Sequence, residues 1–221
     1  MKELVLPPLV DEPKILGDYE HTWTVDNWRD RSKREHGPVF EAGGYPWYVG
    51  KLHSPRDSLS LTHPSSRRIL LFPHGNAVDQ CSIYLEHGFE ADQIPENWSC
   101  CVQFGLVLWN PNDPTLYCHH AAHHRFTKEE GDWGFTRFVE LRRMFNVPWE
   151  GSSRPLCENE TANITAYLRF VEDETGVLWH NFNNYDSKTE TGFVGLKNQG
   201  ATCYLNSLLQ SLYFTNLFRK V

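Results

Sequence analysis

A thiol, a side-chain amide and a chain-breaking glycine lie close together near the end of the sequence, at Cys203, Asn198 and Gly200. The residues that follow place apolar side chains at the i, i+3, i+4, i+7 and i+8 positions of one helix face, namely Leu205, Leu208, Leu209, Leu212 and Tyr213. Thr202 is a suitable N-cap for such a helix. Cys203 is therefore expected in the first helical turn, where unpaired backbone N–H groups and the helix dipole favour a nucleophilic thiolate.

An acyl transfer by this thiol needs hydrogen-bond donors directed at the developing oxyanion. Backbone N–H groups at Thr202 and Cys203 would supply one donor. The amide of Asn198, reaching round the turn at Gln199-Gly200, would supply another. The alternative is that Cys203 simply packs at the edge of an apolar helix, as a small apolar residue. Spacing alone leaves both interpretations open.

The run from Gly195 to Gln210, GLKNQGATCYLNSLLQ, resembles the cysteine box of ubiquitin-specific peptidases, which have a papain-like cysteine peptidase domain. The resemblance implies that Cys203 is the nucleophile that attacks the isopeptide carbonyl at the ubiquitin C-terminus, and that Asn198 stabilises the oxyanion. A general-base His and an orienting Asp or Asn are also needed, and in this family both lie far downstream of the Cys. The last His here is His180, so we expect this chain alone to have no useful hydrolase activity.

The preceding part of the chain consists of short strand-like runs separated by turn residues. Several runs alternate between apolar and polar residues, which is typical of strands with one buried face. The predicted strands are His21 to Val25, Tyr45 to Leu52, Arg68 to Phe72, Cys81 to Glu86, Ser99 to Trp109, Leu116 to His124 and Asn163 to Val171. This pattern predicts a mainly β protein with an antiparallel β-sandwich.

Residues Ile15 to Asp173 resemble a MATH domain, also called a TRAF-like domain. The supporting runs are His21-Thr22-Trp23-Thr24-Val25, Tyr45-Pro46-Trp47-Tyr48-Val49 and Asp132-Trp133-Gly134-Phe135. We therefore predict a flexible leader at 1–16, a MATH domain at 17–173, a linker at 174–191 and the N-terminal piece of a peptidase domain, with its first helix, at 192–221.

Asp132 and Trp133 are predicted to lie in a turn between strands, where they would form a recognition surface. Trp supplies an apolar platform, and the neighbouring carboxylate accepts a hydrogen bond from a peptide that adds along a sheet edge. The alternative is that Trp133 belongs to the core. The resemblance implies a shallow groove for short Ser-containing peptides of substrate proteins at Asp132 and Trp133. It also implies a nearby basic residue, but neither Arg29 nor Arg31 can be chosen for this role.

A MATH domain directly before this cysteine box is similar to the family of the herpesvirus-associated ubiquitin-specific protease and its fungal counterparts. Two functions follow. The first is a fragment of a deubiquitinating cysteine peptidase that carries its substrate-recruitment domain and binds ubiquitin only in the complete parent. The second is a non-catalytic MATH adaptor that binds peptides and keeps a vestigial cysteine box.

The composition limits the classes of partner that this protein is expected to bind. A formal net charge of −7 at pH 7 disfavours nucleic acid, because phosphate binding needs clustered Lys and Arg. No apolar run approaches the length of a membrane span, and no signal peptide is evident. We therefore expect an intracellular protein of the cytoplasm, the nucleus or both, with no nucleic acid or membrane partner.

Cysteine and histidine spacing indicates no metal or other cofactor. None of the six Cys residues forms a C-x-x-C pair, which argues against a zinc knuckle. The His-rich run from His119 to His124 lacks carboxylate or Cys at fitting spacing, so we interpret it as a polar surface strand.

Overall fold

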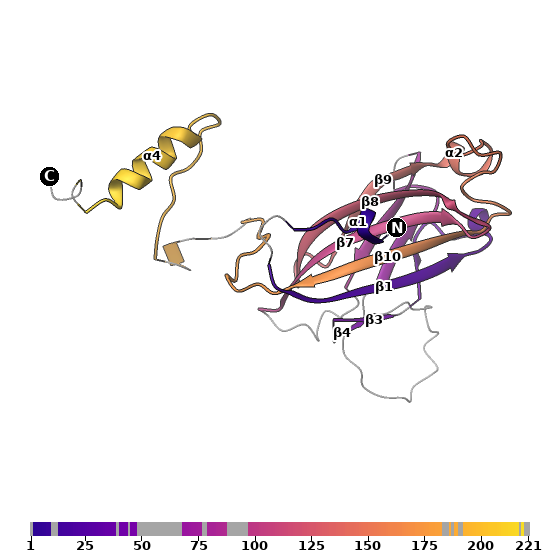
Figure 1. Cartoon of the computed structure of the whole chain (residues 1–221), viewed down its shortest axis with the longest axis horizontal. Helices are drawn as coiled ribbons and strands as arrows, with labels where there is room; N and C mark the ends of the chain where they lie inside the picture. The colour runs from indigo at the N-terminus through magenta and orange to yellow at the C-terminus, as the bar shows by residue number, and fades with distance from the viewer. Residues whose placement is uncertain are drawn as a thin grey trace. The chain divides into compact units, whose positions relative to one another are not determined.

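The structure is a computed structural model, and it describes residues 2–9, 13–38, 40–43, 45–47, 68–76, 79–87, 97–182, 186, 188–189, 192–216 and 218. The chain divides into two compact units, 1–180 and 181–221. We describe each unit by itself. Figure 1 shows the strands of the first unit and the single long helix of the second.

The first unit contains two four-stranded antiparallel sheets. Sheet A has the order β1 (Ile15–Val25), β10 (Ala162–Val171), β7 (Ser99–Asn110) and β8 (Asp113–Thr127), and these strands lie side by side in Figure 1. Sheet B has the order β2 (Glu35–His36), β5 (Arg68–Phe72), β6 (Gln80–Glu86) and β9 (Asp132–Glu140). The shorter elements are the hairpin β3 (Phe40–Ala42) and β4 (Tyr45–Trp47), the helices α1 (Lys2–Val5) and α2 (Leu141–Phe145), and the 3-10 turn η1 (Trp28–Asp30).

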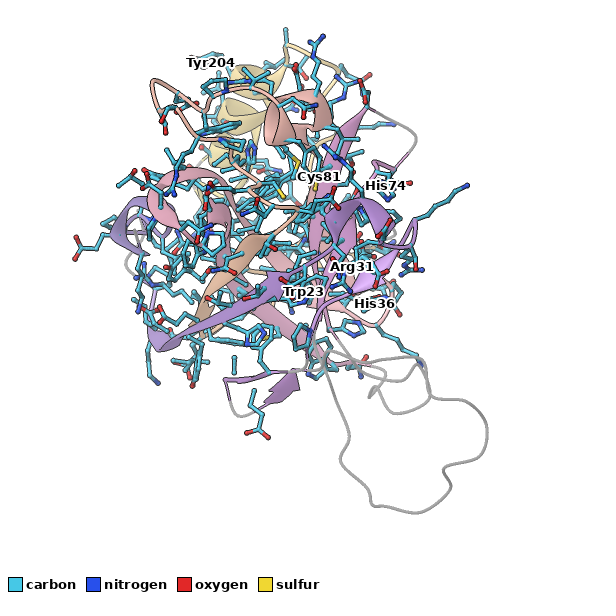
Figure 2. The ribbon with its side chains drawn as sticks, turned by 90° about the vertical axis from the view of Figure 1, so that its right-hand side faces the viewer. Trp23, Arg31, His36, His74, Cys81 and Tyr204 are labelled. Carbon is cyan, nitrogen blue, oxygen red and sulfur yellow. The ribbon has the colours of Figure 1, made fainter. Side chains whose placement is uncertain are left out.

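The core forms between the inner faces of the two sheets because apolar residues alternate along their strands. Phe104, Leu106 and Leu108 of β7 are fully buried, as are Ile83 and Leu85 of β6, and all five belong to one apolar cluster. Cys81 is fully buried in the same cluster (Figure 2). The predicted mainly β, antiparallel sandwich is confirmed.

Most predicted strands are present, and several are longer than expected. The strand predicted from His21 begins at Ile15, and the one predicted from Leu116 begins at Asp113. The strand predicted over Tyr45 to Leu52 is described only as β4, because residues 48–52 lie outside the described residues. Strands β2, β3 and β9 (Asp132–Glu140) had not been predicted.

The prediction that Asp132 and Trp133 lie in a turn is wrong, because both residues belong to the first part of β9. Gly134, the next residue of β9, has a specific role in the sheet. An added Cβ at Gly134 would overlap the backbone of Ile83 and Tyr84 on β6. Gly134 therefore permits a close approach of two strands, which is a recognised use of glycine within a sheet.

The N-terminal segment, expected to be a loose leader, packs on sheet A. The side chain of Val5 is fully buried and lies where a Cβ of Gly105 would be. Gln103 on the same strand donates a hydrogen bond to the carbonyl of Pro7 at 3.0 Å, and Lys2 pairs with Asp18 at 3.3 Å. The missing side chain at Gly105 makes room for Val5.

We expect the substitution Gly105→Ala to displace α1, because the new methyl group would overlap Val5. Losing the burial of one aliphatic side chain costs about 1.5–3 kcal/mol. Urea unfolding of the whole chain measures this loss, and the double variant Gly105→Ala with Val5→Ala should recover part of it, since the overlap is then relieved. Unchanged stability of Gly105→Ala would contradict the packing of α1.

The second unit contains α4 (Cys203–Tyr213), the helix predicted from the apolar periodicity. Thr202 occupies the N-cap position, but its side chain makes no hydrogen bond to the helix. Leu205, Leu208 and Leu209 are exposed. Among the described residues of this unit, none covers these three leucines on the apolar face of α4.

Candidate functional site

The loop before α4 is organised by the side chain of Asn198. Its Oδ1 accepts hydrogen bonds from the backbone N–H of Gly200 at 3.1 Å and of Thr202 at 3.3 Å, and from the Thr202 hydroxyl at 3.2 Å. The hydroxyl of Thr202 in turn accepts from the N–H of Gln199 at 2.9 Å. Gly200 has a φ of +104°, which glycine adopts without strain.

This geometry fixes the orientation of the Asn198 amide. Two backbone N–H groups point at one end of the amide, and only its oxygen can accept them. The NH₂ group consequently lies at the opposite end, away from the turn. Asn198 can hold the turn and donate a hydrogen bond at the same time.

Cys203 is the first residue of α4 and is exposed. The first helical hydrogen bond is donated by the N–H of Asn206 to the carbonyl of Thr202 at 2.8 Å. The side-chain amide of Asn206 also donates to the carbonyls of Leu196 and Lys197, each at 3.4 Å. These contacts tie the loop to the helix, so the predicted donor, Asn198, and the predicted nucleophile, Cys203, belong to one small structured region.

Asp132 and Trp133 occupy adjacent positions of β9, so their side chains lie on opposite faces of the strand. Asp132 is paired with Glu86 and Trp133 with Leu85. Because Leu85 is a core residue, Trp133 lies on the inner face of sheet B and Asp132 on the outer face. Among the described residues, β9 has a ladder partner on one side only, which is β6.

Charged residues gather around Asp132 at this end of sheet B. Burial and the neighbouring Glu86 carboxylate raise the pKa of Asp132, and Arg34 opposes this shift. The guanidinium of Arg34 lies 3.6 Å from Glu86, and His36 Nε2 lies 3.4 Å from the same carboxylate. No described residue donates a hydrogen bond to the carboxylate of Asp132, which is therefore available as an acceptor.

Glu86, Arg34 and His36 had not been predicted as part of this site. The alternation Cys81, Ile83, Leu85 does put Glu86 on the outer face, but its pairing with Asp132 requires the register of β9. The two arginines that had been considered contact other groups. Arg29 pairs with Glu160 at 3.1 Å, and Arg31 donates to the carbonyl of Asp26 at 2.8 Å. In Figure 2, Arg31 lies near His74, whose ring nitrogen is 3.0 Å from the Arg31 carbonyl oxygen.

Trp133 is 45% exposed and stacks on His124 of β8. The two ring centroids are 4.2 Å apart and the rings are 8° from parallel. Burial of the imidazole lowers the pKa of His124 to about 4. The ring under Trp133 is therefore neutral at physiological pH. The core interpretation of Trp133 is only partly right, because one side of the indole rests on the protein while much of the ring is exposed.

We expect the substitution His124→Phe to reduce the loss of stability on acidification. The unfolded chain binds a proton at His124 near its ordinary pKa of 6.5, while the folded chain does so only near 4. The unfolded state is therefore favoured as pH falls through this window, and the stabilisation is complete above it. Urea unfolding at pH 7, 5.5 and 4.5 should give a smaller decrease for the variant. A decrease equal to that of the unchanged protein would contradict the buried, neutral state of His124.

The other histidines of β8 serve separate contacts. His120 Nε2 lies 3.0 Å from the carbonyl oxygen of Phe138 on β9, and the ring of His123 meets Trp179 at a tilt of 31° with centroids 4.6 Å apart. In the part of the chain that the structure describes, no three His, Cys, Asp or Glu residues are grouped so as to hold a metal ion. In the same part, no helix has the length and apolar character needed to cross a membrane.

Comparison with known families agrees with the two parts of this chain. Residues 24–147 match the MATH domain family, and residues 194–221 match the family described as ubiquitin carboxyl-terminal hydrolase. The MATH match covers more than half of the chain, so this protein belongs to the MATH domain family. Its cysteine box, with Cys203 and Asn198, falls within the second match.

The similar proteins are ubiquitin carboxyl-terminal hydrolases by name. The chain is 42% identical over 224 residues to ubiquitin carboxyl-terminal hydrolase 15 of Schizosaccharomyces pombe, covering 90% of this chain and 18% of that protein. It is 38% identical to ubiquitin carboxyl-terminal hydrolase 15 of Saccharomyces cerevisiae, with 98% and 17% covered. It is 36% identical to ubiquitin carboxyl-terminal hydrolase 7 of Drosophila melanogaster, with 69% and 12% covered. The chain thus spans less than a fifth of the length of these relatives.

Proposed function

We propose that residues 17–173 bind extended Ser-containing peptides of substrate proteins along the free edge of β9. The observation that carries this proposal is the placement of Asp132 and Trp133 on opposite faces of a strand that has one ladder partner among the described strands. A peptide that adds to such an edge directs successive side chains to alternate faces. One side chain would meet Asp132 and the next would meet Trp133.

The two faces of the edge offer different chemistry. On the outer face, the Asp132 carboxylate is partly removed from water and meets no described donor, so a serine hydroxyl of the ligand would satisfy it. On the inner face, the exposed side of Trp133 offers an apolar surface. A short peptide with a serine next to an apolar residue matches this arrangement.

The length of the paired segment is limited by a bulge in β9. The register with β6 shifts between Cys81 and Ile83, and the hydroxyl of Ser82 donates to the carbonyl of Thr136 at 2.6 Å. The regular edge therefore extends only from Asp132 to Phe135. Bulges of this kind end strand pairing, which fits a short recognition motif.

We further propose that the longer protein containing this chain is a deubiquitinase that cleaves isopeptide bonds to ubiquitin through the Cys203 thiol. The exposed position of Cys203 at the first turn of α4 supports this role, as does the outward NH₂ of Asn198 as an oxyanion donor. No His follows Cys203 in the sequence, so hydrolysis is proposed for the longer protein and not for these residues alone. The peptide site of the MATH domain would recruit substrates to it.

The thiols support an intracellular location in the cytoplasm, the nucleus or both. Cys81, Cys101 and Cys157 are buried free thiols, and Cys203 is an exposed one. A catalytic Cys203 has to stay reduced, and reducing compartments keep thiols in this state. Fractionation of cells that express the tagged full-length protein measures this location.

We expect Trp133→Ala and Asp132→Ala each to weaken peptide binding by about tenfold or more, as is usual for residues at the centre of an interface. The ligand would be a library of fluorescent ten-residue peptides with a fixed central Ser, and fluorescence anisotropy would report binding to the whole chain. Trp179→Ala is the matched control, because Trp179 meets His123 instead of His124. Binding that is unchanged by Trp133→Ala would remove the site from β9.

In the full-length protein, we expect Asn198→Asp to lower kcat for a ubiquitin C-terminal substrate by about 10²–10³-fold, as the loss of one oxyanion donor does. The carboxylate still accepts from Gly200 and Thr202, so the turn is kept while the donating NH₂ is lost. Substrate binding should change little. Full activity of Asn198→Asp would limit Asn198 to a structural role, and Cys203→Ala defines the background rate.

A further inference from the structure

His124 joins the peptide edge to the core. Its side chain comes from β8 of sheet A, while Trp133 comes from β9 of sheet B, and no described backbone ladder joins the two sheets. His124 is only 6% exposed. Besides its parallel contact with Trp133, its ring meets Phe126 edge-on, with centroids 4.8 Å apart and planes at 88°.

The contacts continue into the centre of the sandwich. Phe126 is fully buried and lies 6.2 Å from Phe104, measured between ring centroids. Four aromatic rings thus form a continuous row, Phe104, Phe126, His124 and Trp133, which ends at the surface. The exposed indole is supported by a chain of rigid neighbours in a close-packed interior.

Hydrogen bonding satisfies the imidazole only in part, because the one hydrogen-bonding contribution to its pKa comes from the backbone of Glu130 and opposes the lowering of that pKa by burial. The buried Nε2 atom of His124 has no hydrogen-bond partner. The nearest carboxylate oxygen, on Glu130, is 3.7 Å away, which is beyond hydrogen-bond distance. A buried polar atom without a partner costs free energy, so the flat shape of this ring and its contacts with Trp133 and Phe126 contribute to its place in the fold.

Trp133 would have considerable freedom without this support. Its ladder partner on the inner face is Leu85 of β6, and the residue is still 45% exposed, so the ring of His124 stacked on it limits the rotation of the indole. An indole that rotates has to be ordered each time a ligand binds, and ordering a side chain lowers affinity. When a flat ring beneath the indole already holds it in place, the entropy cost of ordering it no longer lowers the affinity for the ligand.

We propose that His124 is a positioning residue for the peptide site, holding the Trp133 indole against sheet A in the orientation that receives a ligand side chain. This inference rests on the peptide-binding function proposed above. His124 does not touch the ligand; it acts through Trp133. The property that matters is a flat, uncharged ring, which phenylalanine shares with neutral histidine.

The test compares His124→Ala, His124→Phe and the control His123→Ala in the whole chain. His123 is the next residue of the same strand and meets Trp179. With the same fluorescent library of Ser-containing ten-residue peptides, we expect His124→Ala to weaken binding about tenfold. His124→Phe and His123→Ala should each bind within about twofold of the unchanged chain, since neither removes the flat support of Trp133.

A second readout separates positioning from general stability. The indole N–H resonance of Trp133, assigned by its loss in Trp133→Phe, should show increased fast motion in the ¹⁵N heteronuclear NOE of His124→Ala. The heteronuclear NOE of the other indoles, and that of the Trp133 indole in His124→Phe, should be unchanged. If His124→Ala does not fold, His124→Thr replaces it, since a β-branched residue suits a strand.

The outcomes distinguish the two proposals. If Trp133→Ala abolishes binding but His124→Ala binds normally, the positioning role is overturned and the peptide site stands. If Trp133→Ala itself binds normally, the peptide site and the role of His124 within it are both overturned. An affinity loss in His124→Ala with an immobile indole would also overturn positioning, because the effect would then act elsewhere.

Discussion

Packing between the inner faces of sheets A and B is the interaction on which the rest of this structure depends. No described backbone ladder joins the two sheets, so their association comes from buried side chains such as Phe104, Leu106 and Ile83. Each such side chain contributes roughly 1.5–3 kcal/mol when it is buried. The position of β9 relative to β8, and therefore the shape of the peptide edge, follows from this packing.

At the rim of the sandwich, the same packing produces a surface with two kinds of chemistry. Trp133 and Phe135 face sheet A, where they meet His124 and His120. Asp132 faces away from the core, beside Glu86. The His120–Phe138 contact fixes the far part of β9 to β8. The edge is therefore open over only a few residues, bounded by the bulge opposite Ser82.

The cysteine box follows a different principle, because its geometry is local. Asn198, Gly200 and Thr202 build their turn from contacts within a few residues, and α4 begins directly after it. Such a motif needs little tertiary support to adopt its shape. The helix α4 is formed although its leucines are exposed, so its formation does not depend on their burial.

The sequence by itself determined the local features: the alternating strands, the helix from Cys203, and the residues of the turn around Asn198. It failed at Asp132 and Trp133, which were predicted to lie in a turn, because the close approach of β9 to β6 at Gly134 cannot be seen in one strand alone. Only the tertiary structure placed Asp132 beside Glu86 and Arg34, and Trp133 on His124. Asp132 meets residues distant in sequence, and Trp133 and His124 are close in sequence but lie in different sheets. Both arrangements depend on strand register and on the packing of two sheets, which no local pattern decides.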